Sequence, residues 1–214
     1  MQNITITRKY LLSLRTITLL IKFCGMSALI VVLASCSLKD RKLENDVEHF
    51  LGTVISIPEY QMQRFGSGGI DSLDRANGRY QMVVYTDSTE CSPCAIKHLN
   101  NWESIIDTLE SFPLYKGTVF IFSPSKSSYE EVNEELRKTN IKYSMYLDTC
   151  NVFLNKNRGI PSNGRMHTFL IDDNNRVALI GNPLTNEKIR TMYYELLGGN
   201  FSTEDAKGFF ESVK

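Results

Sequence analysis

The sequence lacks an excess of charge of either sign, because 24 Lys and Arg residues balance 24 Asp and Glu residues among its 214 positions. A chain without a basic excess lacks the electrostatic footprint of a nucleic-acid-binding protein, so we expect no nucleic-acid partner. A glycine-rich phosphate loop, a Gly-x-Ser-x-Gly motif and a His-Glu-x-x-His motif are also missing. Their absence argues against P-loop enzymes, α/β-hydrolases and zinc proteases.

Acidic residues are missing from the first 39 positions, whereas four basic residues precede position 23: Arg8, Lys9, Arg15 and Lys22. Residues 23–35 follow without any charge and end in small side chains. A basic segment followed by an apolar run of roughly 7–15 residues is typical of a secretory signal, and a membrane-spanning helix needs about 20 residues. Residues 1–35 are therefore predicted to be a cleaved signal peptide. A retained membrane anchor is the weaker alternative.

The end of this segment, Leu33-Ala34-Ser35-Cys36, resembles the lipobox of bacterial lipoproteins. The resemblance implies cleavage before Cys36, a diacylglycerol on its sulfur, and a fatty acyl chain such as palmitate on the new N-terminus. An ordinary cleavage site beside a small residue is the alternative. Residues 36–46 are polar and are predicted to be a lipidated tether. Ser37 after the cysteine resembles the sorting signal that favours the outer membrane over the inner.

Strand and helix patterns alternate through residues 47–214, without internal repeats, and predict a single α/β domain with much of its sheet parallel. The predicted strands are 53–57, 80–85, 117–123 and 141–147, followed by a β-hairpin of 166–171 and 176–180. Pro93 is predicted to lie in the first turn of one continuous helix that reaches Leu109. Further helices are predicted over 127–139, opened by a capping box of Ser127 and Glu130, over 185–197 and over 203–213.

Two cysteines stand where strand 80–85 gives way to this helix, in the order Cys91-Ser92-Pro93-Cys94. The free N–H groups at a helix start favour a thiolate, so Cys91 is predicted to be the nucleophile and Cys94 the resolving thiol. A static disulfide that pins the loop is the alternative. Glu90 adjoins the pair, and its carboxylate opposes thiolate formation. Lys97 could offset that charge if it points toward the pair.

The segments VVYTDSTECSPC (83–94) and HTFLIDDNNRVALIG (167–181), in this order, resemble the thioredoxin-like superfamily, and most of all its TlpA-type lipoproteins and periplasmic thiol oxidoreductases. The resemblance covers about residues 52–197. It implies a thioredoxin-like fold, with a central mixed β-sheet flanked by helices, and thiol–disulfide exchange without an organic cofactor. Members of the superfamily place a cis-proline before the strand that here begins at Thr168. In this sequence Met166 aligns with that proline, and the nearest proline, Pro161, lies five residues earlier. Either Pro161 takes the proline's place, or the proline that shapes the partner-binding groove is missing.

Four further residues are considered beside the pair: Cys24, Cys150, His98 and His167. Cys24 is predicted to leave with the signal, and Cys150 is predicted to be a buried small apolar residue, with a regulatory thiol as the alternative. Without the proline, a copper or zinc site becomes an alternative, because thiolates and imidazoles are donors for both metals. Its donors would be Cys91, Cys94, His98 and His167. Against it, His98 has the position of a helix-surface histidine, and copper chaperones with this fold use a different cysteine spacing.

The sequence thus predicts a membrane-anchored thiol–disulfide oxidoreductase of the bacterial cell envelope, which acts on exported proteins through Cys91 and Cys94. Its partners would be protein thiols and disulfides, and its membrane contact would be the lipid on Cys36. A non-enzymatic interaction module with a structural disulfide is the first alternative. A copper- or zinc-binding chaperone is the second.

Overall fold

A computed structural model describes residues 41–66, 78–139 and 142–200. The predicted signal peptide, Cys36 and the predicted helix 203–213 lie outside these ranges. The chain divides into two compact units, residues 1–46 and 47–214. Residues 41–50 are helical, so the described end of the predicted tether is a helix. Among the described residues, no helix combines the length and the apolar character needed to cross a membrane.

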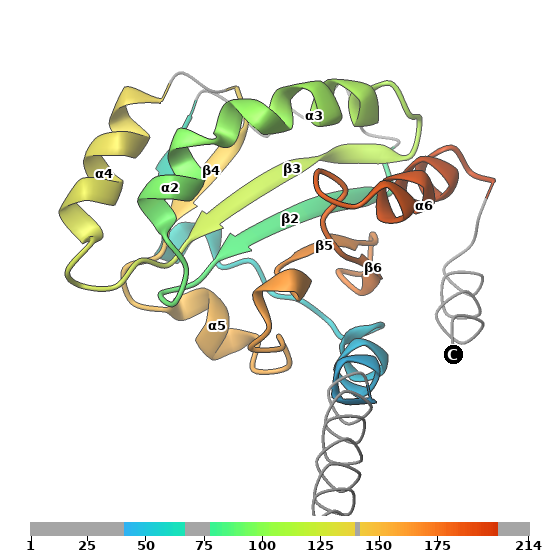
Figure 1. The fold of residues 1–214 in the computed structure, drawn as a ribbon, viewed down its shortest axis with the longest axis horizontal. Coiled ribbons are helices and arrows are strands. Elements are labelled where there is room, and N and C mark those ends of the chain that lie inside the picture. Colours follow the sequence, from blue (N-terminus) through green and yellow to red (C-terminus); the bar gives the residue numbers. More distant parts are fainter. Residues whose placement is uncertain (1–40, 67–77, 140–141, 201–214) are drawn as a thin grey trace, which may run out of the picture. The chain divides into compact units, whose positions relative to one another are not determined.

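The second unit is built on one six-stranded sheet in the order β1-β4-β3-β2-β5-β6 (Figure 1). Its strands are β1 (Gln63–Phe65), β2 (Tyr80–Thr86), β3 (Tyr115–Phe122), β4 (Ser144–Leu147), β5 (Thr168–Ile171) and β6 (Val177–Ile180). Strand β3 runs parallel to β2 and β4, whereas β5 is antiparallel to both β2 and β6, and β1 is antiparallel to β4. The sheet is therefore mixed, with β2 and β3 at its centre.

The connections place most helices on one face of this sheet. The helices are α2 (Ser92–Lys97), α3 (Glu103–Glu110), α4 (Tyr129–Lys138), α5 (Val152–Lys156) and α6 (Glu187–Leu197). The chain steps from β2 to β3 to β4 in one direction, and right-handed crossovers of that kind keep their helices on the same side. Figure 1 shows α2, α3 and α4 on that side, and α5 on the other. This order of strands and helices confirms the predicted thioredoxin-like fold.

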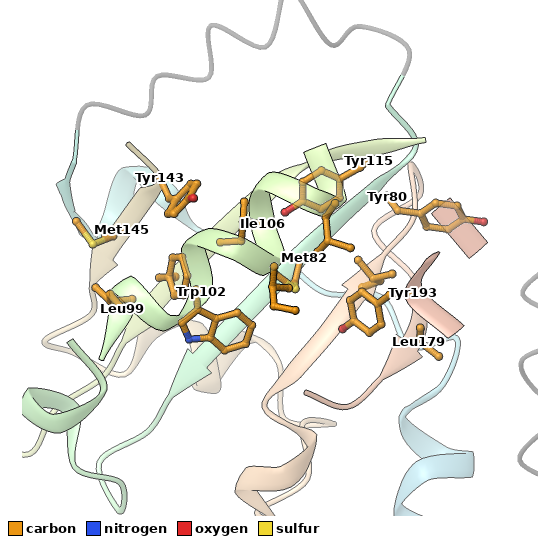
Figure 2. Packing of buried hydrophobic residues seen from close by; sticks show 14 of the residues in the cluster. Tyr80, Met82, Leu99, Trp102, Ile106, Tyr115, Tyr143, Met145, Leu179 and Tyr193 are labelled. Carbon is orange, nitrogen blue, oxygen red and sulfur yellow. The ribbon is translucent and has the colours of Figure 1, made fainter. Parts of the chain in front are cut away.

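Both faces of the sheet are buried. On one face, Met82, Phe120 and Leu170 pack with apolar residues of α2, α3, α4 and α6. Figure 2 shows Met82 beside Ile106 and Tyr193 of this cluster. On the other face, Phe169 packs edge-on against Phe50 at 5.1 Å between ring centroids, and the ring of Tyr85 lies 5.0 Å from that of Phe153 in α5. A central strand covered on both sides explains the nearly continuous apolar run of β2.

The predicted strand 53–57 is wrong. Only Val54 forms a bridge, to Arg176, and its side chain is exposed. Backbone bonds join Gly52, Thr53 and Ile55 to residues 175–177, and the chain beyond Ile55 lies opposite the hairpin turn. There the Asn157 side chain bonds both backbone groups of Ser56, accepting from its N–H and donating to its carbonyl, each at 2.8 Å. The edge strand next to β4 is instead β1, a three-residue strand that the sequence pattern did not predict.

The continuous helix predicted from Pro93 to Leu109 is also wrong. Helix α2 ends at Lys97, and a 3₁₀ helix (Leu99–Trp102) precedes α3. The apolar stripe survives the break because side chains three apart share a face in a 3₁₀ helix, and Leu99 and Trp102 are both buried.

The capping box predicted at Ser127 is not formed. Helix α4 begins one residue later than expected, with Ser128 as its N-cap and no side-chain cap bond. The hydroxyl groups of Ser127 and Ser128 each bond to that of Ser125 at 2.9 Å instead. The strand predicted over 141–147 is shorter in the structure, where β4 begins at Ser144.

Candidate redox site

The two cysteines lie at the start of α2, where the chain leaves the central strand β2. Cys91 is the N-cap residue, and its sulfur accepts the backbone N–H of Cys94 at an N–S distance of 3.3 Å. Pro93 occupies the first turn, as predicted. Cys91 and Cys94 are joined by a disulfide with a Cα–Cα distance of 5.2 Å, and both residues are exposed. An exposed disulfide can meet a thiol of another protein.

The loop between β2 and α2 is held by its own polar groups. The Asp87 carboxylate accepts the backbone N–H of Thr89 at 2.7 Å and the Thr89 hydroxyl at 2.6 Å. Glu90 donates its N–H to the Asp87 carbonyl and accepts that of Ser92 at 3.0 Å. These bonds hold the backbone of Glu90, whose carboxylate was predicted to oppose the thiolate of the next residue, Cys91.

Lys97 does not offset this charge. Its ammonium lies 3.7 Å from the Glu131 carboxylate of α4, with both side chains more than half exposed. Helix α2 is also short, with six residues. The stabilisation expected from a long helix dipole is therefore reduced, although the N–H groups of the first turn remain.

A buried histidine lies against Glu90 instead. His167 immediately precedes β5 and is 3% exposed. Its Nε2 lies 2.9 Å from the carbonyl oxygen of Pro161, and its Nδ1 lies 3.7 Å from Oε2 of Glu90, a separation of an ion pair rather than of a hydrogen bond. The backbone carbonyl of His167 accepts the N–H of Tyr85, and the two rings lie 5.1 Å apart.

The surroundings of His167 act on its pKa in opposite directions. Burial lowers the pKa of the imidazole, but the Glu90 carboxylate and the Pro161 carbonyl outweigh burial and raise it above 6.5. Tyr85, whose ring lies against that of His167, has a buried hydroxyl. Burial raises the pKa of Tyr85 to about 12, so its phenol stays neutral.

Met166 stands in the place aligned with the superfamily's proline. It is buried, it ends a short 3₁₀ helix (Gly164–Met166), and its N–H donates to the Asn163 carbonyl at 2.9 Å. Pro161, the alternative for that place, contacts His167 through its carbonyl oxygen. Sequence reasoning singled out His167 as a metal donor and missed its pairing with Glu90.

The four donors of the metal alternative are not gathered. Within residues 41–66, 78–139 and 142–200, no group of three or more His, Cys, Asp or Glu side chains is placed to hold a metal ion. His98 is exposed at the end of α2. The cysteine pair is oxidised, and thiolates rather than disulfides are the metal ligands.

The prediction for Cys150 is wrong, since its free thiol is exposed. It lies in the turn after β4, where the buried Asp148 carboxylate accepts the N–H groups of Cys150, Val152 and Phe153 at 3.3, 2.9 and 2.8 Å. This turn points Cys150 outward. A cavity of about 260 Å³ lies beside it, lined by Pro124, Ser125, Lys126, Tyr129 and Thr149. It lies where β3 and β4 end, the edge of the sheet at which β2 leads to Cys91.

No family model and no curated protein matches the sequence. Among solved structures, a thioredoxin-like protein from Bacteroides caccae is 14% identical at a TM-score of 0.41, over 74% of this chain and 52% of that one. A Chlorobium tepidum protein assigned as thiol:disulfide interchange protein DsbE is 14% identical at a TM-score of 0.41. The match covers 71% of this chain and 98% of that one. The mitochondrial 2-Cys peroxiredoxin of Plasmodium falciparum is 14% identical at a TM-score of 0.37. The match covers 71% of this chain and 99% of that one. The fold assignment rests on the strand order and connections of this chain.

Proposed function

We propose that this chain is a thiol–disulfide oxidoreductase that exchanges its Cys91–Cys94 disulfide with cysteines of other proteins. One observation carries the proposal: the disulfide is exposed at the N-cap of α2, directly after the central strand β2. A disulfide that serves only stability has no need of exposure, whereas exchange requires that a foreign thiolate or disulfide reach a sulfur atom.

The exchange follows from the order of the two cysteines. In the reduced protein, the Cys91 thiolate attacks a substrate disulfide, forms a mixed disulfide and releases one substrate sulfur as a thiolate. The Cys94 thiolate, one helical turn later, then attacks the Cys91 sulfur and releases the second substrate sulfur. The substrate gains two electrons and two protons, and the chain is left with the Cys91–Cys94 disulfide. Another dithiol protein must reduce this disulfide before a second cycle.

The same proposal places the domain in the bacterial cell envelope, on the outer membrane rather than the inner. Its support is the lipobox-like Leu33-Ala34-Ser35-Cys36 and the polar residues 36–46. A lipid on Cys36 would hold the domain at a membrane while leaving the disulfide free to meet exported proteins. Several acyl chains give stable attachment without a membrane-spanning helix.

The reduction potential of the purified full chain tests the proposed exchange. An exchange disulfide should equilibrate with glutathione at a potential between roughly −120 and −270 mV. A structural disulfide lies below about −300 mV and resists reduction. A potential in the lower range, together with failure to reduce insulin, would refute the exchange activity.

Two observations favour a second candidate, an interaction module with a fixed disulfide. Met166 is buried at the position where the superfamily's groove has a proline, and Glu90 adjoins Cys91. In this candidate the disulfide pins the β2–α2 loop, and its loss would lower stability without ending any reaction. The reduction potential distinguishes the two candidates.

A further inference from the structure

His167 faces hydrogen-bond acceptors at both ring nitrogens, at 2.9 Å from the Pro161 carbonyl oxygen and 3.7 Å from Oε2 of Glu90. A carbonyl oxygen only accepts, so Nε2 carries a hydrogen in either protonation state. The neutral ring therefore turns a lone pair of Nδ1 toward the Glu90 carboxylate. The protonated ring turns an N–H toward it. The geometry around the ring suits the imidazolium.

Of the residues that the structure describes, the other groups that act on the ring are neutral or acidic and supply no competing positive charge. From β2, the Tyr85 ring lies 5.1 Å away and carries a neutral phenol. From the β2–α2 loop, the Asp87 carboxylate adds a second negative charge near the ring. From the 3₁₀ helix before β5, Gly164 presents only backbone beside Nδ1. The neighbours named here are acidic or neutral, so proton loss from His167 changes the net charge next to Cys91.

We infer that His167 is a positioning residue for the nucleophile: its imidazolium neutralises the Glu90 carboxylate beside Cys91, and its deprotonation leaves Cys91 next to that charge. The inference rests on the proposed function, because it assigns to His167 control of the thiolate that performs the exchange. With His167 protonated, the pKa of the Cys91 thiol is lower and more thiolate is present. With His167 neutral, the pKa of the Cys91 thiol is higher.

The direction of the His167 pKa agrees with this role. Burial alone would strip the proton near neutral pH, but Glu90 and the Pro161 carbonyl hold the pKa above the ordinary 6.5. The imidazolium is therefore the main form at pH 6, and the neutral ring prevails only at more alkaline pH. Coupling is reciprocal, so forming the Cys91 thiolate also strengthens the hold of His167 on its proton.

Three substitutions separate the charges. Glu90→Gln removes the carboxylate. Wherever the His167 ring is neutral in this variant, neither residue 90 nor residue 167 carries a charge. His167→Gln leaves the carboxylate without its partner at every pH. Gly164→Ala adds a methyl group that overlaps Oε1 of Glu90, the end of a flexible side chain, and so displaces the carboxylate from His167 without removing any charged group. Glu131→Gln, which removes the partner of Lys97 on α4, is the matched control.

The readout is the pH profile of Cys91 alkylation in the reduced full chain carrying Cys94→Ser. Iodoacetamide labelling is quantified by mass spectrometry of the tryptic peptide 80–97. The peptide 143–156 of the same digest carries the exposed Cys150 and reports reagent reactivity in the same sample. His167→Gln should raise the pKa of Cys91 by about one pH unit at pH values where the unmodified ring is protonated. Gly164→Ala should act in the same direction.

The His167-containing chain should follow the Glu90→Gln profile at pH values where its own ring is protonated and the ring of the Glu90→Gln variant is neutral. It should cross to the His167→Gln profile at alkaline pH. The Glu131→Gln profile should coincide with that of its parent. The inference would be overturned if the pH profiles of Cys91 alkylation in Glu90→Gln, His167→Gln and their parent coincide. A lower pKa of Cys91 in His167→Gln than in the parent would also overturn it. If His167→Gln fails to fold, Gly164→Ala carries the test. The assay needs no substrate protein, so absent insulin reduction with a normal His167 effect would refute only the proposed function.

Discussion

Replacing Asp148 by alanine should destabilise the domain strongly, although the residue lies outside the cysteine pair. Its carboxylate is 1% exposed and accepts three backbone N–H groups, those of Cys150, Val152 and Phe153. The Ser123 hydroxyl lies 3.4 Å from Oδ2. These bonds start α5, and α5 holds Phe153 against the Tyr85 ring beneath the site. Asp148 thereby connects the end of β4 to the packing under the redox loop.

The loss of the three N–H bonds in Asp148→Ala should lower the free energy of unfolding by a different amount for each bond. The N–H of Phe153 is buried and should cost about 1.5 kcal/mol when unpaired, and the partly buried N–H of Val152 about 1 kcal/mol. Water can reach the N–H of exposed Cys150, so its loss adds only about 0.5 kcal/mol. The free energy of unfolding should fall by about 3 kcal/mol in total. Asp148→Asn keeps Oδ1 but turns an NH₂ group toward Phe153, and should cost about half as much.

Urea unfolding, followed by the fluorescence of the single, buried Trp102, measures this loss. With a urea dependence of about 2 kcal/mol per M, the Asp148→Ala midpoint should fall by about 1.5 M. Asp172→Ala is the matched control, since its carboxylate also accepts two turn N–H groups but at the exposed hairpin. It should cost less than about 1 kcal/mol. A loss below about 1 kcal/mol in Asp148→Ala, or equal losses in both aspartates, would contradict the argument.

Four further predictions concern the lipid, the cysteine pair and the residues beside it. Cys36→Ala should abolish incorporation of labelled fatty acid and detergent-phase partitioning, and a variant that stays labelled would rule out lipid on Cys36. Cys94→Ser should trap mixed disulfides through Cys91, which should also alkylate first in the reduced chain; equal, slow alkylation would indicate a structural pair. Met166→Pro should raise insulin reduction if this residue shapes the partner groove, at a cost of about 2 kcal/mol for the lost N–H bond and buried side chain; unchanged activity in the folded variant would exclude that role. Because the folded-state pKa of His167 is raised, its contribution to stability is complete below pH 6.5 and is lost as pH rises through the folded pKa; His167→Gln should flatten the dependence of the urea midpoint on pH in that window.

The elements with strong local patterns were predictable from the sequence. The apolar run of β2, the hairpin of β5 and β6, and helix α6 each carry their own periodic or turn signal, and each lies within a few residues of its predicted range. The position of Cys91 at a helix start followed from the same signals. Strand β1 gave no such signal, because its three residues are exposed or only partly buried and depend on β4 for pairing.

The misjudged residues depend on contacts distant in the chain. The break after α2 was hidden because a 3₁₀ turn keeps the same apolar spacing as the helix it interrupts. Cys150 looked like a core residue after a buried strand, but the carboxylate of Asp148 turns the chain outward there. Ser56, in the segment predicted to be a strand, bonds instead to the side chain of Asn157, about a hundred positions later. None of these contacts has a local signature.

The pairing of His167 with Glu90 lies between these cases, because the pairing of β2 with β5 brings their backbones to the same edge of the sheet. Strand β5 runs antiparallel to β2 with Thr168 opposite Val84, so the residue before β5 must lie beside the loop that follows β2. A residue directly before Cys91 and a residue directly before β5 are thus brought to the same edge of the sheet. In this chain the two are an acid and a histidine. The Glu90 carboxylate is therefore paired with His167, directly before β5, and not with Lys97 of α2. Chains of this fold with an acid before the first cysteine should tolerate it best when a cation precedes the antiparallel strand.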